Sequence, residues 1–401
     1  MQTFRYLFFT LGVIVMFILA IAETSISSEI LDSLMIKNGG AEQAFFLRDY
    51  GAPLLSLIYG LGFIYLVRNG KLNLAFSLFL SINIAVWIVC AFSSKMNAFS
   101  DPLFTAVTYA WLKATAPLLI VLTTGLINQY YKFRYAAVLY PLLLILSSFL
   151  LVYVKDLILP LWNDKDVHYL WAIIATCGLA ILALYNILMT LPPPLNDEAP
   201  SHTWISWLSL FALAFGANLS KIIPADFFKT VTKTLFTHPA DYSYMMGNLT
   251  VSMGIYQIYA LLFCLILGIA LFICRSKIYF GIGLFILAFV FGGGILEFLA
   301  GSQTNLSQDN FNLISLGLSV NKIAATLLIS FVLQLAYFAF NAAQRFSAKA
   351  AVHFIFFPLS VMAMKLLPWL QELTSFLPLA VFIAACALSA AGLYKLKQRI
   401  A

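Results

Sequence analysis

Charged residues are scarce in this chain of 401 residues. They make up 10% of the sequence, whereas hydrophobic residues make up 62% and the mean hydropathy is +0.95. Soluble domains carry charge on about a quarter of their residues, so the composition excludes a soluble protein and predicts an integral membrane protein. The net charge of +7 arises mostly in short loops between apolar runs, and it therefore does not indicate nucleic-acid binding.

The sequence also lacks the motifs of common enzymes and metal sites. It contains no HExxH, no GxSxG and no Walker A motif. The five cysteines lie in or beside apolar runs without CxxC spacing. The four histidines are scattered over distant segments: His168, His202, His238 and His353. We therefore predict no enzyme activity, no metal site, no cofactor and no disulfide framework.

Long apolar runs, in contrast, recur along the whole chain. Each is close to the roughly 20 residues that a helix needs to cross about 30 Å of hydrocarbon. The sequence predicts twelve spans, near residues 4–22, 51–67, 72–92, 103–127, 135–154, 167–190, 203–222, 246–272, 278–300, 322–343, 351–370 and 376–394. The longest predicted connections are 23–50 and 223–245, so little remains for a soluble domain.

A proline-rich stretch divides these spans into two sets of six. Residues 191–202, "LPPPLNDEAPSH", contain three consecutive prolines, which cannot continue a helix. We interpret them as a cytoplasmic linker between an N-terminal bundle, 1–190, and a C-terminal bundle, 203–401. This is the plan of the major facilitator transporters, in which the substrate binds between the halves near the midplane. The predicted fold class is thus an all-α, major-facilitator-like membrane protein, with the first, fourth, seventh and tenth spans lining a central cavity.

Basic residues fall on alternate connections, as the positive-inside rule requires of the cytoplasmic side. The residues on that side include Arg5, Arg68, Lys71, Lys132, Arg134, Arg275, Lys277, Arg345, Lys349, Lys395 and Lys397. The opposite connections, such as 23–50, mix acidic and basic residues. Both termini are therefore predicted to be cytoplasmic.

Three stretches resemble the bacterial and plastid ATP/ADP translocases, also called the nucleotide transporter family. They are "GGAEQAFFLRDYGAPL", "GLINQYYKFRYAAVLYPLL" and "FGANLSKIIPADFFKTVTKTLFTHPADYSYMMGNLTVSMGI". The matching residues of the longest stretch are Gly216, Asn218, Leu219, Lys229, Lys233, Pro239, Tyr242, Met246, Gly247, Asn248, Gly254 and Ile255. The resemblance implies nucleotide exchange by a secondary antiporter in a bacterial inner membrane. Where the family has glutamates in its fourth and seventh spans, this chain has Leu112 and Lys221.

Lysines inside the predicted spans are the main candidates for substrate contacts. A lysine at the centre of a span costs about 2.5 to 3.5 kcal/mol to insert. Lys113 lies near the middle of its span, and its alternative role is to pair with a carbonyl or carboxylate for folding. Lys221 is either a second contact or the interfacial end of its helix, and Lys322 is either a contact or an ordinary flank. An excess of cations over carboxylates at membrane depth favours an anionic substrate.

Two further polar residues complete the predicted site. Glu297 follows three glycines in "GGGILEFLAGS", which either loosen the helix, as in discontinuous transporter helices, or allow close packing against a neighbour. Asn218 lies within an apolar run, where interhelical hydrogen bonding explains it as well as ligand contact does.

The leading hypothesis is a monomeric secondary transporter that moves a nucleotide or a related phosphorylated anion by alternating access. Its predicted partners are this small anionic substrate and membrane lipid, with no nucleic acid. The alternatives are a flippase or exporter for another anionic or lipid-linked substrate, and an accessory membrane protein without transport activity.

Overall fold

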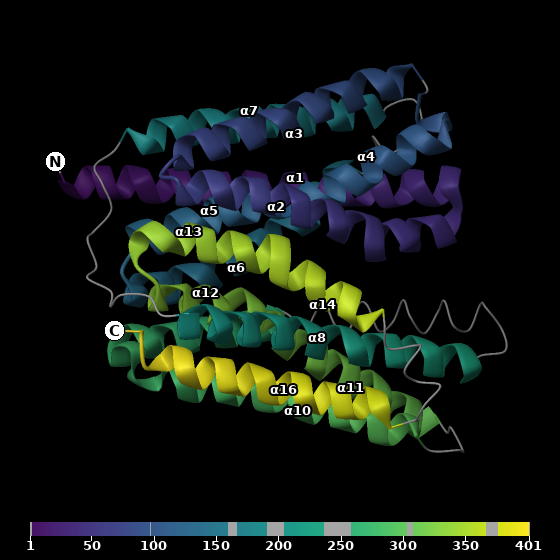
Figure 1. Cartoon of the computed structure of the whole chain (residues 1–401), viewed down its shortest axis with the longest axis vertical. Helices are drawn as coiled ribbons and strands as arrows, with labels where there is room; N and C mark the ends of the chain where they lie inside the picture. The colour runs from purple at the N-terminus through teal and green to yellow at the C-terminus, as the bar shows by residue number, and fades with distance from the viewer. Residues whose placement is uncertain are drawn as a thin grey trace. The chain divides into compact units, whose positions relative to one another are not determined.

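The computed structural model describes residues 2–96, 98–158, 167–190, 204–235, 258–302, 308–365 and 376–400. Within these ranges every regular element is a helix (Figure 1). The elements are α1 (Gln2–Phe46), η1 (Leu47–Gly51), α2 (Ala52–Arg68), α3 (Leu72–Lys95), η2 (Ala98–Ser100), α4 (Pro102–Thr115), α5 (Pro117–Tyr130), α6 (Phe133–Ile158), α7 (Val167–Met189), α8 (Trp204–Leu235), η4 (Arg275–Ile278), α10 (Tyr279–Gly301), α11 (Gln308–Leu327), η5 (Leu328–Val332), α12 (Leu333–Ala336), η6 (Tyr337–Ala339), α13 (Ala342–Ala351), η7 (Val352–Phe356), α14 (Phe357–Met364) and α16 (Leu377–Lys397). A further helix covers 258–274, directly before η4.

The helices have the length and apolarity of membrane spans, as the composition predicts. Ten helical stretches of the described chain are long and apolar enough to cross a membrane. One of them, Ile258–Gly301, has 44 residues and is long enough for two crossings, and the shorter apolar helix Phe133–Leu146 adds another. The all-α, multi-pass fold class is confirmed. The predicted linker 191–202 and the motif residues from Pro239 to Ile255 lie outside the described residues.

The first span is longer than predicted. We expected it to end near residue 22 and to be followed by a loop, but α1 continues to Phe46 with one break at Gly40, where φ is 79°. Its apolar span is Leu7–Asp32. The polar residues Glu23 and Ser27 are buried on this helix, 3% and 6% exposed. A helix satisfies its own backbone, so polar side chains are tolerated at this depth where they face protein instead of lipid.

Two other predicted boundaries are wrong in the same way. The tenth span was expected to begin at 322, but α11 begins at Gln308 and its apolar span is Phe311–Ala339. The seventh was expected to end at 222, but α8 continues through Pro224 to Leu235. Polar residues such as Lys229, Lys233, Gln308 and Asp309 lower the local hydropathy of these helix extensions. Lys221 and Lys322 therefore lie inside helices and not at helix ends.

The chain groups into two compact units by contacts between residues. Unit 1 comprises residues 1–131, 143–197 and 342–358, and unit 2 comprises 132–142, 198–341 and 359–401. Residues 132–142 thus group with unit 2, and residues 342–358 group with unit 1.

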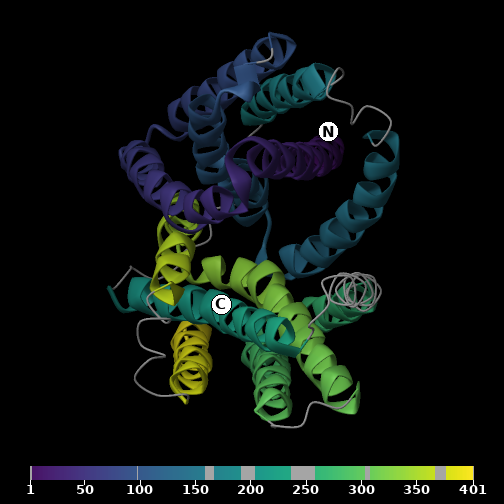
Figure 2. The same ribbon diagram turned by 90° about the vertical axis from the view of Figure 1, so that its right-hand side faces the viewer.

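In unit 1, α7 packs against α3 and α1, and α1 also packs against α4 and α5 (Figure 1). Gly178 permits the close approach of α7 to α3, because a Cβ at this position would lie 2.4 Å from the Trp87 ring. In unit 2, α8 runs beside α16, drawn in yellow in Figure 2, and α10 packs along α11.

Candidate functional site

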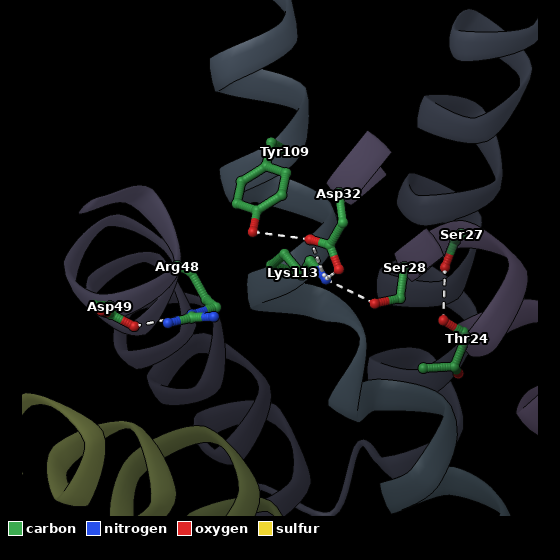
Figure 3. Close-up of polar contacts among 8 residues, drawn as sticks. All are labelled: Thr24, Ser27, Ser28, Asp32, Arg48, Asp49, Tyr109 and Lys113. Carbon is green, nitrogen blue, oxygen red and sulfur yellow. Dashed lines mark hydrogen bonds and ion pairs between the residues drawn. The ribbon is translucent and has the colours of Figure 1, made fainter. Parts of the chain in front are cut away.

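An ion pair between α4 and α1 is the centre of the polar cluster in unit 1 (Figure 3). Lys113 Nζ lies 3.0 Å from each carboxylate oxygen of Asp32. The side chain of Lys113 is 19% exposed and that of Asp32 is 47% exposed. The carboxylate supplies the counter-charge that a lysine at this depth requires. In this conformation Lys113 therefore pairs with a carboxylate, which is the alternative to a substrate contact that the sequence left open.

Residues one turn away on both helices complete this contact. Ser28, four residues before Asp32, accepts a 2.7 Å hydrogen bond from Lys113 Nζ. Tyr109, four residues before Lys113, donates its hydroxyl proton to Asp32 Oδ1 at 3.0 Å. Because residues four apart share one face of a helix, two such pairs face each other across the α1–α4 contact. Asp101 caps the start of α4 by accepting from Leu103 N at 2.9 Å.

Further charges lie around this centre. On η1, Arg48 Nε donates to Asp49 Oδ1 at 3.0 Å, and the electrostatic influence of both residues reaches Tyr109 (Figure 3). Along α1, Thr24 Oγ1 contacts Glu23 Oε2 at 3.2 Å, and Ser27 Oγ donates to Thr24 O at 3.2 Å. Each cation drawn in Figure 3, Lys113 and Arg48, has a carboxylate partner.

A buried basic stripe on α13 and η7 was not predicted. Arg345, Lys349 and His353 recur every four residues and are 2%, 0% and 9% exposed. Arg345 Nη1 donates to Asn128 O at 2.7 Å, near the end of α5, where the helix dipole favours a cation. Arg345 and Lys349 were predicted to lie in a cytoplasmic loop, and this prediction is wrong because Gln344–Met364 is an apolar helix. The four-residue spacing was the signal that could have identified the stripe.

Two lysines of unit 2, Lys221 and Lys322, are within electrostatic range of each other. Lys221 on α8 and Lys322 on α11 are both half-buried, and the positive charge of Lys322 acts on Lys221. Within the described chain, Lys221 forms no ion pair with a carboxylate. The structure thus brings together two of the five predicted site residues, while Lys113 belongs to unit 1.

The other two predicted site residues are buried in unit 2. Asn218 Nδ2 donates to Ser360 Oγ of α14 at 2.5 Å, so this amide links two helices. Glu297 is completely buried on α10. The helix α10 runs without interruption from Tyr279 to Gly301, so the adjacent glycines do not break it.

Close packing explains one of these glycines directly. A Cβ on Gly293 would lie 2.6 Å from Asn321 N and 2.7 Å from Gly317 O of α11. Asn321 Nδ2 also donates to Val290 O at 2.8 Å across the same contact. Of the two interpretations of the glycine run, the structure supports close helix packing.

Comparisons with solved structures show the fold. The chain is similar to the human organic anion transporter MFSD10, with 11% identity, a TM-score of 0.63 and coverage of 97% of this chain and 99% of that one. It is also similar to the proton:xylose symporter XylE of the major facilitator superfamily, with 12% identity, a TM-score of 0.61 and coverage of 100% and 97%. A bacterial homologue of the iron transporter ferroportin, in its outward-facing state, gives 13% identity, a TM-score of 0.64 and coverage of 98% and 100%.

The fold is therefore major-facilitator-like over nearly the whole chain. No protein-family model matches the sequence, and no curated protein matches it. The comparisons thus do not confirm the resemblance to the ATP/ADP translocase family.

Proposed function

We propose that this protein is a secondary transporter that moves a small anionic solute, a nucleotide or a related phosphorylated metabolite, across a bacterial inner membrane. The observation that carries the proposal is the pair of half-buried lysines, Lys221 and Lys322, inside membrane-spanning helices. Like charges in a medium of low dielectric repel each other strongly. An anion bound beside both ammonium groups relieves this repulsion, and phosphate oxygens accept their protons.

Alternating access is the proposed transport mechanism. The fold is shared with an organic anion transporter and a proton:xylose symporter, and we propose that the halves 1–190 and 203–401 move about the linker 191–202. Because substrates of this fold bind between the halves of one chain, a monomer suffices. An anion that favours the loaded conformation shifts the population toward it by its difference in affinity for the two states. In this scheme both termini are cytoplasmic.

The remaining candidates have secondary roles in the proposed site. Lys113 contacts the substrate only after the anion replaces Asp32 as its partner. The free energy needed to break the ion pair therefore lowers the affinity of Lys113 for the anion. Asn218 and Glu297 belong to the same unit as Lys221; the amide of Asn218 can donate a hydrogen bond to an anion, whereas the carboxylate of Glu297 can only accept one, from a hydroxyl group of the substrate. The proposal requires none of these residues to change its charge.

Counterflow in proteoliposomes tests the proposal. Vesicles preloaded with unlabelled ATP, a sugar phosphate or sulfate receive the corresponding labelled anion outside, and labelled xylose serves as the neutral control. We expect saturable uptake of at least one phosphorylated anion, accelerated by internal anion, with xylose uptake at the level of empty vesicles.

Other outcomes of this experiment would identify one of the two alternative functions, a flippase or an accessory membrane protein. Movement of a fluorescent anionic lipid between leaflets, without uptake of soluble anions, would identify a flippase. Failure of every soluble anion and every lipid would reject transport and favour an accessory membrane protein.

A further inference from the structure

An apolar groove lies along unit 2 between the 258–274 helix, α10 and α11. It encloses about 360 Å³. Ile286 and Leu327 are among the buried residues of its floor. Phe263, Phe285 and Phe289 line its rim and are 41%, 46% and 49% exposed. The groove is therefore open on one side and lined by hydrocarbon.

The groove offers no polar group to a ligand. Among its lining residues only Ser319 has a polar side chain, and its Oγ donates to Ser315 O at 2.8 Å, within α11. A polar ligand would lose its hydration there without gaining a hydrogen bond. The occupant that fits this lining is a hydrocarbon chain.

One end of the groove points toward a pair of basic residues. The 258–274 helix and α10 are joined by η4, which carries Arg275 and Lys277, both exposed. Tyr279, the first residue of α10 after η4, donates a hydrogen bond to Val332 O at 2.8 Å. Leu327, five residues before Val332, is therefore the lining residue of α11 that lies toward η4. The two helices that form the walls therefore converge on a positively charged turn.

The spacing between charge and groove matches a membrane lipid. Phe285 lies eight residues beyond Lys277, which is about 12 Å along a helix. The polar interfacial layer of a bilayer is roughly 5 to 8 Å thick on each side. A phosphate held at η4 thus places the attached acyl chain at the depth of the groove.

We propose that this surface binds an anionic glycerophospholipid, with its phosphate at Arg275 and Lys277 and one acyl chain in the groove. Charge complementarity favours an anionic over a zwitterionic headgroup, because residues 258–296 contain no aspartate or glutamate. Basic residues next to a span are the usual recognition element for such lipids at the cytoplasmic face. The site is distinct from Lys221 and Lys322 and does not depend on the transported substrate.

Native mass spectrometry of the purified full-length protein tests the proposal. The detergent-solubilised protein is titrated with phosphatidylglycerol, phosphatidylcholine or glycerol phosphate. We expect wild type to bind phosphatidylglycerol at least ten-fold more tightly than phosphatidylcholine, and glycerol phosphate not to bind. The double variant R275Q/K277Q should lose this preference, with roughly a five-fold weakening for each basic residue.

Matched variants separate this site from general charge attraction. R68Q/K71Q removes the same charge, one arginine and one lysine, from exposed residues at the turn between α2 and α3 and should leave phosphatidylglycerol binding unchanged. Ala324→Phe fills the groove and should weaken phosphatidylglycerol binding more than five-fold; Ala260→Phe, on the groove's other wall, replaces it if the first variant does not fold. Equal binding of the two lipids by wild type, equal loss in both charge variants, or full binding by a folded groove variant would overturn the proposal.

Discussion

At the scale of single residues, Lys221 decides whether the anion proposal is correct. Lys221→Gln removes the attraction for an anion, so the half-saturation concentration for the transported anion should rise about ten-fold, as expected for loss of about 1.4 kcal/mol. Lys221→Glu should be worse, because it adds repulsion to the lost attraction. The measurement is initial counterflow rate against anion concentration at matched protein density.

The exposed Lys95 at the end of α3 provides a control for this experiment, since Lys95→Gln removes an equal charge outside the proposed site. Identical kinetics for wild type, Lys221→Gln and Lys221→Glu would show that Lys221 is structural only.

The Lys113–Asp32 pair makes a second prediction at this scale. Lys113→Gln and Asp32→Asn each leave one charge without its partner and should lower the thermal unfolding temperature. The double variant should be less affected than the sum of the single ones, with a coupling energy of about 1 kcal/mol, because Asp32 is partly exposed and screened. Thermal unfolding in nanodiscs measures this cycle. Strictly additive effects would show that the ion pair contributes nothing.

At the scale of elements, the close contact between α10 and α11 requires a glycine at position 293, which faces α11, but not at position 292, which does not. Gly293→Ala places a methyl group 2.6 Å from Asn321 N and should destabilise the protein by about 1 to 3 kcal/mol. Gly292 has open space at the corresponding position, so Gly292→Ala should be neutral or stabilising through higher helix propensity. The unfolding temperatures of the two variants in the same nanodiscs test this contrast. Equal shifts would mean that the helices separate easily.

The helix α13 shows that basic residues can be buried in a helix although their composition is typical of a loop. Its positions 345 and 349 fit a cytoplasmic loop by composition, yet both side chains are buried. Arg345 is held by Asn128 O near the end of α5. A charge-assisted bond of this kind stabilises the contact between two helices that are distant in the sequence. The positive-inside rule counts such a residue as a loop charge although it stabilises helix packing.

At the scale of the whole molecule, labelling of a native cysteine, Cys274, tests the predicted membrane topology. Cys274 is exposed directly before η4, whereas Cys90, Cys264 and Cys386 are buried. Because η4 belongs to the predicted cytoplasmic side, a membrane-impermeant maleimide should label Cys274 in inverted vesicles and not in intact cells. Cys274→Ser should remove the label. Labelling from the outside of intact cells would reverse the predicted orientation.

The sequence by itself determined the fold class of this protein. Runs of about 20 apolar residues can satisfy their backbone polar groups in a bilayer only as helices, so an all-α, multi-pass chain follows from composition and run length. The positions of Lys113, Lys221 and Lys322 within or beside apolar runs also identified cations near membrane depth. Hydropathy is an average over a window, however, and it does not show which way a side chain points.

Only the tertiary structure decided which polar residues have partners and where the helices end. Asp32 was assigned to a loop, and its pairing with Lys113 follows from the packing of α1 against α4. The 0% exposure of Lys349 depends on neighbours distant in the sequence. The physical reason is that a polar side chain inside a membrane is stable only against a complementary protein surface, and that surface forms when the helices pack.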